Sequence, residues 1–141
     1  QVSEFSSQVV IVDDSYNANP ASMKAGIEYA HALAKHKKIA VQWAILGDML
    51  ELGERGEEYH RAIARYLKKA HFSELWAVGD LMHYTVEEAQ RRGIISRHFS
   101  SLDELLEYLS RLRVKRTLIF VKGSRAMRME KVVGALQERL G

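Results

Sequence analysis

Polar and charged residues that could bind a nucleotide or an anion gather in four short segments of this chain. The segments are DDSYNANP (13–20), GDMLELG (47–53), GD (79–80) and KGSRAMRME (122–130), and each directly follows a short apolar run. Such runs are typical of buried strands, and the loops that leave the carboxyl ends of parallel strands line one edge of a sheet. We therefore predict that the four segments meet on one rim and form a binding site there.

The first segment places two carboxylates, Asp13 and Asp14, at a strand end just before a helix. A carboxylate in this position can accept hydrogen bonds from ribose hydroxyls or help to hold a magnesium ion, and the helix N-terminus favours an anion. Tyr16 offers a flat face to a base, and Asn17 and Asn19 can donate and accept hydrogen bonds. The same residue types also suit an ordinary strand-to-helix turn, so both interpretations remain open.

The second segment carries two acidic groups, Asp48 and Glu51, between glycines. They could face a cation or the amine of a substrate. The sequence favours a structural interpretation, in which Met49, Leu50 and Leu52 form a buried plug while Asp48 caps a turn.

The last segment combines Lys122 and Arg125 with a glycine and the Ser124 hydroxyl at a helix start. This combination suits a receptor for a carboxylate or a phosphate, and Arg favours planar, bidentate recognition. Alternatively, both cations are simply solvated at the sheet edge. His60 begins the helix after the second segment and could point toward the site or serve as a surface or capping residue.

The chain lacks the sequence motifs of several known chemistries. No GxxxxGK[ST] or GxGxxG phosphate loop, GxSxG nucleophile elbow or HExxH spacing is present, and the chain has no cysteine. We predict no catalytic residue and no metal ligand of its own. If this chain contacts a nucleotide, it would do so from one side only, and the main phosphate-binding site would lie outside this chain.

Strands and helices alternate around these segments. The apolar runs predict strands at 9–12, 38–46, 75–78 and 117–121, and a shorter strand at 97–99. Helices are predicted from stripes at 23–34, 59–67, 80–92, 102–112 and 129–140, with Asn19–Pro20 and Ser101–Glu104 as start signals and Gly93 as a stop signal. This pattern predicts one α/β domain, a Rossmann-like three-layer sandwich with a mostly parallel sheet. Residues 1–8 fit either a leading strand or a linker, so the domain is placed at 9–141.

The composition of the chain limits the classes of partner that it could bind. The 141 residues include 21 Lys and Arg against 18 Asp and Glu, a net charge of +3 with the two signs interspersed. This balance argues against a nucleic-acid partner. No apolar stretch approaches the roughly 20 residues that cross a bilayer, and no signal peptide opens the chain, so we expect a cytoplasmic protein with no membrane partner. The start at Gln1 rather than Met indicates a segment of a longer protein or a processed start.

The motifs DDSYNANP, LGDMLELG and VKGSRAMRMEKVV, in this order and spacing, resemble the C-terminal domain of the Mur ligases, in particular the type that adds D-alanyl-D-alanine. The resemblance spans about residues 9–140. It implies the third domain of an ATP-dependent amide ligase of peptidoglycan synthesis, whose central domain holds the phosphate loop and Mg²⁺ and whose N-terminal domain holds the UDP-N-acetylmuramoyl-tripeptide. The C-terminal domain would close over ATP and help to bind D-Ala-D-Ala, and would be inactive alone.

The resemblance also assigns residues. It implies that Asp14 lies near the ATP ribose or phosphates, with Tyr16, Asn17 and Asn19 in the stretch that faces the nucleotide. It implies that Ser124 and Arg125, with Lys122 beside them, receive the carboxylate of the incoming dipeptide; Asp48 and Glu51 are placed at the substrate with less definite contacts. Two alternatives stay open. One is a related ligase for another amino acid, such as a diaminopimelate- or lysine-adding enzyme or folylpolyglutamate synthase, and the other is a free-standing binding or regulatory module of receiver type.

Overall fold

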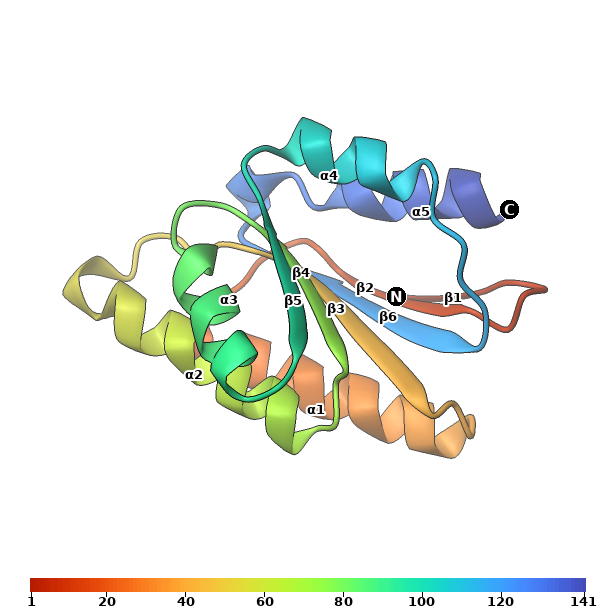
Figure 1. Ribbon diagram of the computed structural model, residues 1–141, viewed down its shortest axis with the longest axis horizontal. Helices are drawn as coiled ribbons and strands as arrows, with labels where there is room; N and C mark the ends of the chain where they lie inside the picture. The colour runs from red at the N-terminus through yellow and green to blue at the C-terminus, as the bar shows by residue number, and fades with distance from the viewer.

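A six-stranded sheet runs through the centre of the molecule, with helices on both of its faces (Figure 1). The computed structural model describes all residues, 1–141. The strands are β1 (Val2–Glu4), β2 (Val10–Asp14), β3 (Val41–Gly47), β4 (Glu74–Val78), β5 (Ile95–Phe99) and β6 (Thr117–Lys122). The α-helices are α1 (Pro20–His36), α2 (Gly56–Lys69), α3 (Met82–Arg91), α4 (Leu102–Leu109) and α5 (Glu130–Leu140), and two short 3₁₀ helices are η1 (Gly53–Arg55) and η2 (Arg125–Met127).

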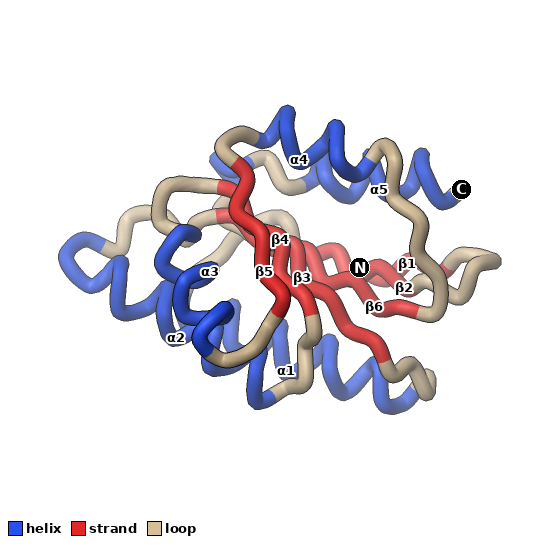
Figure 2. The backbone as a smooth tube through the Cα atoms, viewed as in Figure 1, coloured by secondary structure: helices blue, strands red, loops and turns tan.

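The strand order is β1-β2-β6-β3-β4-β5, and every pairing except that of β1 with β2 is parallel. The chain moves outward from β3 to β5 and then returns to insert β6 between β2 and β3. Because β2, β3, β4 and β6 run in the same direction, their carboxyl ends share one rim. Figure 2 shows these strands side by side between the helices.

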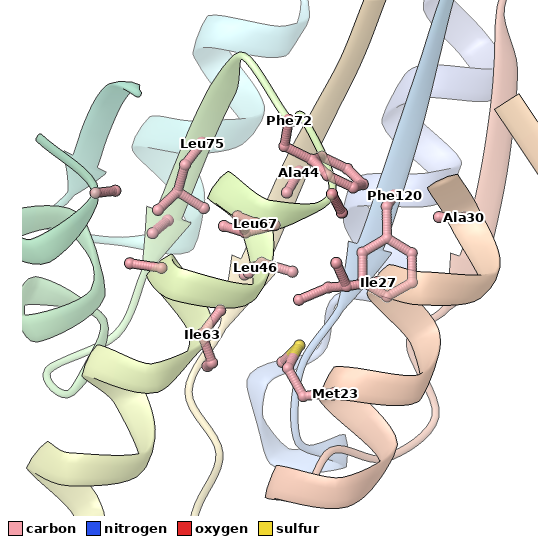
Figure 3. Close-up of a cluster of buried hydrophobic side chains, with 14 of the residues drawn as sticks. Met23, Ile27, Ala30, Ala44, Leu46, Ile63, Leu67, Phe72, Leu75 and Phe120 are labelled. Carbon is pink, nitrogen blue, oxygen red and sulfur yellow. The ribbon is translucent and has the colours of Figure 1, made fainter. Parts of the chain in front are cut away.

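Two apolar clusters fill the layers on either side of the sheet. On one face, α1, α2 and α3 pack against the strands, and on the other face α4 and α5 do so (Figure 1). Figure 3 shows the first cluster, in which Phe120 of β6 lies beside Ile27 of α1 and Leu67 of α2 lies over the sheet. Burial on both faces explains why the central strands read as continuous apolar runs.

The predicted fold class is confirmed, and the differences concern the ends of elements. Residues 1–8 contain the short strand β1, which forms an antiparallel hairpin with β2. The strand predicted at 38–46 begins at Val41 rather than at residue 38, because Lys38 adopts a positive φ of 59° that ends the preceding turn. Helix α4 stops at Leu109, so Leu112 lies beyond the helix, although it is still buried in the second cluster.

The capping signals act largely as predicted. Asn19 caps α1 by accepting a hydrogen bond from Ser22 N–H, and Pro20 occupies the first turn. Ser101 caps α4 through Glu104 N–H. Gly93 follows α3 with a φ of 81°. None of the helices is both long enough and apolar enough to pass through a bilayer.

Candidate functional site

The four polar segments meet on the rim formed by the carboxyl ends of the parallel strands. Ser124 N–H donates to the Asp48 carbonyl (2.9 Å), which joins the segments after β6 and β3. The Asp48 carboxylate accepts from Leu81 N–H (3.1 Å), just after β4, and the Lys122 ammonium donates to Asp14 (2.8 Å), which joins β6 to β2. The predicted convergence is therefore confirmed by direct contacts.

The crevice between β6 and β3 is filled by the chain itself. Helices leave these two strands toward opposite faces of the sheet, an arrangement that often marks a ligand crevice. Here the strand ends approach so closely that a Cβ on Gly123 would lie 3.1 Å from the Cα of Gly47 and 2.7 Å from Cγ of Met129. Space on the rim therefore lies one strand further along, between the segments that follow β2 and β6.

A hollow of about 410 Å³ lies at that position. Its lining includes Asp14 and Tyr16 from the first segment and Arg125 from the last. The Tyr16 side chain is well exposed, and Arg125 lies over its ring at 5.1 Å and donates to its hydroxyl at 3.3 Å. The volume falls within the range of about 300–1,000 Å³ that is usual for small-molecule sites. The structure thus brings Asp14 and Tyr16, two of the four predicted nucleotide-facing residues, together with the predicted anion-binding arginine, whereas Asn17 and Asn19 do not line the hollow.

Gln1 also lines the hollow, and so do three residues of the two motifs to which the resemblance assigned no contact: Asp13, Ser15 and Glu130. Asp13 holds the first segment in shape, because its Oδ1 accepts from both the backbone N–H (3.0 Å) and the hydroxyl (2.6 Å) of Ser15. The only sequence signal for these residues was their place within the two motifs.

Asp14 and Lys122 differ in their access to solvent. The Asp14 side chain is 43% exposed, whereas the Lys122 side chain is 2% exposed and its ammonium donates to Asp14 Oδ2 and to the Asn17 carbonyl, both at 2.8 Å. Lys122 therefore points inward to the first segment, which differs from its predicted place beside a carboxylate receptor on the open rim.

The two asparagines stabilise the turn into α1. The Asn17 side chain accepts from Ala18 N–H (2.9 Å), and the Asn19 side chain caps the helix. Both residues are exposed, so they keep free hydrogen-bonding capacity beside the hollow.

The second segment is held mainly as the structural interpretation predicted. Asp48 is 4% exposed, and its two carboxylate oxygens cap the N-terminus of α3 by accepting from Leu81 N–H (3.1 Å) and Met82 N–H (2.9 Å). Burial raises the pKa of Asp48, and these two N–H groups partly oppose the rise. Met49 is fully buried, whereas Leu50 is only half-buried.

Ser124 and Glu51 differ in whether their side chains are engaged within the protein. The Ser124 hydroxyl, nearly buried, accepts from Leu50 N–H (2.8 Å) and so ties the second segment to the last. Glu51 is exposed and adopts a left-handed backbone conformation with a φ of 63°. Asp48 and Ser124 are therefore engaged within the protein, while the Glu51 carboxylate is free to meet a ligand.

His60 is fully buried and belongs to neither of the predicted surface roles. Its Nδ1 donates to the Gly56 carbonyl (2.7 Å), and its Nε2 accepts from Met49 N–H (3.1 Å), an arrangement that requires the neutral ring. Burial lowers the pKa of His60 below its ordinary value of 6.5, and the Gly56 carbonyl and Asp48 partly oppose this.

This histidine makes stability depend on pH. The unfolded chain binds a proton at His60 near pH 6.5 and the folded chain only at lower pH, so its contribution is present above pH 6.5 and is lost as the pH falls. We expect this group to lower the free energy of unfolding as the pH falls from about 7.5 to about 5.5. Urea unfolding at both pH values measures this change in the free energy of unfolding.

In His60→Gln the drop should shrink, whereas in His36→Gln, which alters an exposed histidine at the end of α1, it should stay as in the unmodified chain. An equal pH effect in His60→Gln and the unmodified chain would contradict the assignment.

A larger hollow, of about 840 Å³, lies between α4 and the strands β3, β4 and β5. It is lined by Trp43, Trp76 and Tyr108 among others, and it includes none of the predicted site residues. Because a site requires convergent chemistry as well as space, we place the candidate site on the rim.

No three His, Asp or Glu side chains come together in an arrangement that could hold a metal ion. The magnesium that the resemblance implies does not fit a site made by these residues alone. We therefore assign no magnesium ligand to this chain and derive no step through the metal.

Fold and site together define a Rossmann-like α/β domain with a charged, partly aromatic hollow on the carboxyl rim of its sheet and no phosphate loop. The chain belongs to the family described as Mur ligase, glutamate ligase domain, whose model matches residues 1–125. This confirms the resemblance found in its motifs.

Individual relatives agree. A protein of Rickettsia prowazekii (strain Madrid E) named UDP-N-acetylmuramoyl-tripeptide–D-alanyl-D-alanine ligase is 31% identical over 127 residues, which cover 90% of this chain and 27% of the relative. A crystal structure of MurF from Acinetobacter baumannii is 25% identical with a TM-score of 0.82, covering 98% of this chain and 30% of that one. MurF ligase from Thermotoga maritima in complex with ADP shares the fold, with 24% identity, a TM-score of 0.73, and coverage of 99% and 30%. The chain thus spans little more than a quarter of the length of the curated relative.

Proposed function

We propose that this chain is the C-terminal domain of an ATP-dependent ligase that joins D-Ala-D-Ala to a UDP-N-acetylmuramoyl-tripeptide in peptidoglycan precursor synthesis. Its role is to close over the nucleotide and help to hold the incoming dipeptide. The observation that carries the proposal is the hollow on the rim, where Asp14, Tyr16 and Arg125 lie together in a domain of this family. The names of its relatives supply the substrate.

The residues of the first segment suit a nucleoside. Oδ2 of Asp14 is held by Lys122, whereas Oδ1 receives no hydrogen bond from the chain and can accept from a ribose hydroxyl. The exposed ring of Tyr16 can stack on a base. Asn17 and Asn19 add exposed amide groups beside it. Because the chain lacks a phosphate loop, the triphosphate would be held mainly by the preceding domain.

Arg125 suits the dipeptide carboxylate. Its exposed guanidinium forms no ion pair with any Asp or Glu of the chain and can bind a carboxylate in a bidentate manner. Ser124 is engaged with Leu50 and would act by shaping this loop. Glu51, whose carboxylate is exposed, would face the amine end of the same ligand, whereas the buried Asp48 would act only by holding its segment in place.

The reaction that this domain would serve has two steps. The tripeptide carboxylate attacks the γ-phosphorus of ATP and releases ADP, which gives an acyl phosphate. The amine of D-Ala-D-Ala then attacks the acyl carbon, the carbon–oxygen bond to phosphate breaks, and the amine loses a proton as the amide forms. Holding the amine against the acyl carbon and excluding water are what a closing domain contributes. The use of ATP and a soluble nucleotide-linked substrate supports a cytoplasmic site of action.

A substrate panel with the full-length protein tests this proposal. We expect ATP-dependent phosphate release and amide formation with D-Ala-D-Ala at least tenfold faster than with meso-diaminopimelate, L-lysine or L-glutamate, and no ligation by residues 1–141 alone. A preference for one of the other acceptors would assign the chain to another ligase of the family. Stoichiometric labelling by acetyl phosphate would favour a receiver-like module, which the burial of Asp48 argues against.

A further inference from the structure

Lys122 lies where two substrate-facing segments join. It ends β6 at the same register at which Asp14 ends β2, so the two side chains project side by side from adjacent parallel strands. Gly26 of α1 leaves room for Asp14 beside Phe120: a Cβ on Gly26 would lie 3.2 Å from Oδ2 of Asp14 and 2.7 Å from Cζ of Phe120.

Both side-chain hydrogen bonds of Lys122 are made to residues of the first segment. Its ammonium donates to Asp14 Oδ2 and to the Asn17 carbonyl, both at 2.8 Å. With only 2% of its side chain exposed, it cannot reach a ligand on the rim. A buried ammonium is costly unless it is paired, so these two acceptors fix both the lysine and the carboxylate.

We infer that Lys122 is a positioning residue for the nucleotide and not part of the receptor for the dipeptide, although it belongs to the same KGSR segment as Arg125. Its ammonium holds one oxygen of Asp14 and the backbone of Asn17, and so presents the free oxygen of Asp14 to the ribose. This inference rests on the proposed function, since it deepens the role of the same site.

The two roles predict different kinetic effects. If Lys122 acts through Asp14, its loss loosens the nucleotide-facing carboxylate and leaves Arg125 in place, because Arg125 contacts Tyr16 and not Lys122. In the full-length enzyme, Lys122→Met should raise the KM for ATP by about tenfold or lower kcat, and should change the KM for D-Ala-D-Ala by less than about twofold. Lys115→Met, in the exposed loop that precedes β6, is the matched control and should change neither KM.

A double-mutant cycle tests the route. In an Asp14→Ala background, Lys122→Met should add less than about twofold to the KM for ATP, because the carboxylate through which it acts is absent. Circular dichroism establishes that each variant is folded. If Lys122→Met does not fold, Lys122→Arg carries the test: it keeps a donor toward Asp14 and should hold the KM for ATP within about threefold of the original value.

A raised KM for the dipeptide with an unchanged KM for ATP, in either Lys122 variant, would overturn the inference. Fully additive effects of Lys122→Met and Asp14→Ala would overturn it too. No effect of Lys122→Met on any constant would overturn it as well. A full-length enzyme that ligates no D-Ala-D-Ala with ATP before any substitution would instead refute the proposed function itself, so the two failures are distinguishable.

Discussion

We expect the Gly79→Ala substitution to strongly destabilise the folded protein, so that a large share of the molecules is unfolded. Gly79 adopts a φ of 120°, a conformation that is essentially restricted to glycine, and an added Cβ would overlap the carboxylate of Asp48. That carboxylate cannot move aside without releasing Leu81 N–H and Met82 N–H at the start of α3. We expect the free energy of unfolding to fall by roughly 4 kcal/mol or more, a large part of the total stability of an ordinary domain. Urea unfolding followed by circular dichroism measures the loss.

Two other glycines provide matched controls. Gly134 lies within α5 with no atom near its missing side chain, so Gly134→Ala should stabilise the chain by about 0.5–1 kcal/mol. Gly53 also has open space but a φ of 62°, so Gly53→Ala should cost about 1 kcal/mol through the backbone alone. A Gly79→Ala chain as stable as Gly53→Ala would show that Asp48 does not hold α3 in the way described.

In the full-length enzyme, substitutions of Asp14 and Arg125 should affect different substrates. Asp14→Asn removes the charge but keeps an oxygen for Lys122, and it should lower kcat/KM for ATP by about 10–100-fold, because hydrogen bonds to a charged group contribute roughly 1.5–3 kcal/mol. Arg125→Ala should raise the KM for D-Ala-D-Ala by a similar factor and leave the KM for ATP within a few-fold. Steady-state kinetics with each substrate varied in turn measure both.

Arg111→Ala serves as the control, since this exposed arginine pairs with Glu107 at the end of α4, away from the rim. It should leave all constants unchanged. Unchanged kinetics in both Asp14→Asn and Arg125→Ala would remove these residues from the site.

The architecture could be predicted because its signals are local and repeated. Apolar runs without alternation predicted the strands that helices cover on both faces, and Asn19–Pro20 and Gly93 predicted helix ends that the backbone confirms. The convergence of four segments followed from a rule of topology and needed no knowledge of strand order. The position of β6 between β2 and β3 was not predictable, because nothing local in the chain encodes which strand pairs with which.

The site was predicted less fully, because a side chain's direction depends on neighbours distant in sequence. Lys122 was read as an exposed cation from its motif, but the register that sets it beside Asp14 turns it inward. Asp48 and Ser124 reached the rim as predicted, yet their polar atoms bond other segments. The burial of His60 follows from the packing of the GDMLELG segment over α2, which a surface pattern of period 3.6 does not show.

The chain's two tryptophans give it a built-in optical probe. Trp43 and Trp76 lie with ring centroids 5.1 Å apart beneath α4, and Tyr108 contacts Trp76 at 5.2 Å. The two indole rings are tilted by 51°, and the emission and near-ultraviolet dichroism of such a close pair report whether strands β3 and β4 remain packed. The tryptophan pair lies apart from Tyr16 and Arg125, so a nucleotide bound on the rim should leave its spectrum nearly constant. Denaturant should abolish the same signal. One spectroscopic measurement therefore distinguishes nucleotide binding from unfolding.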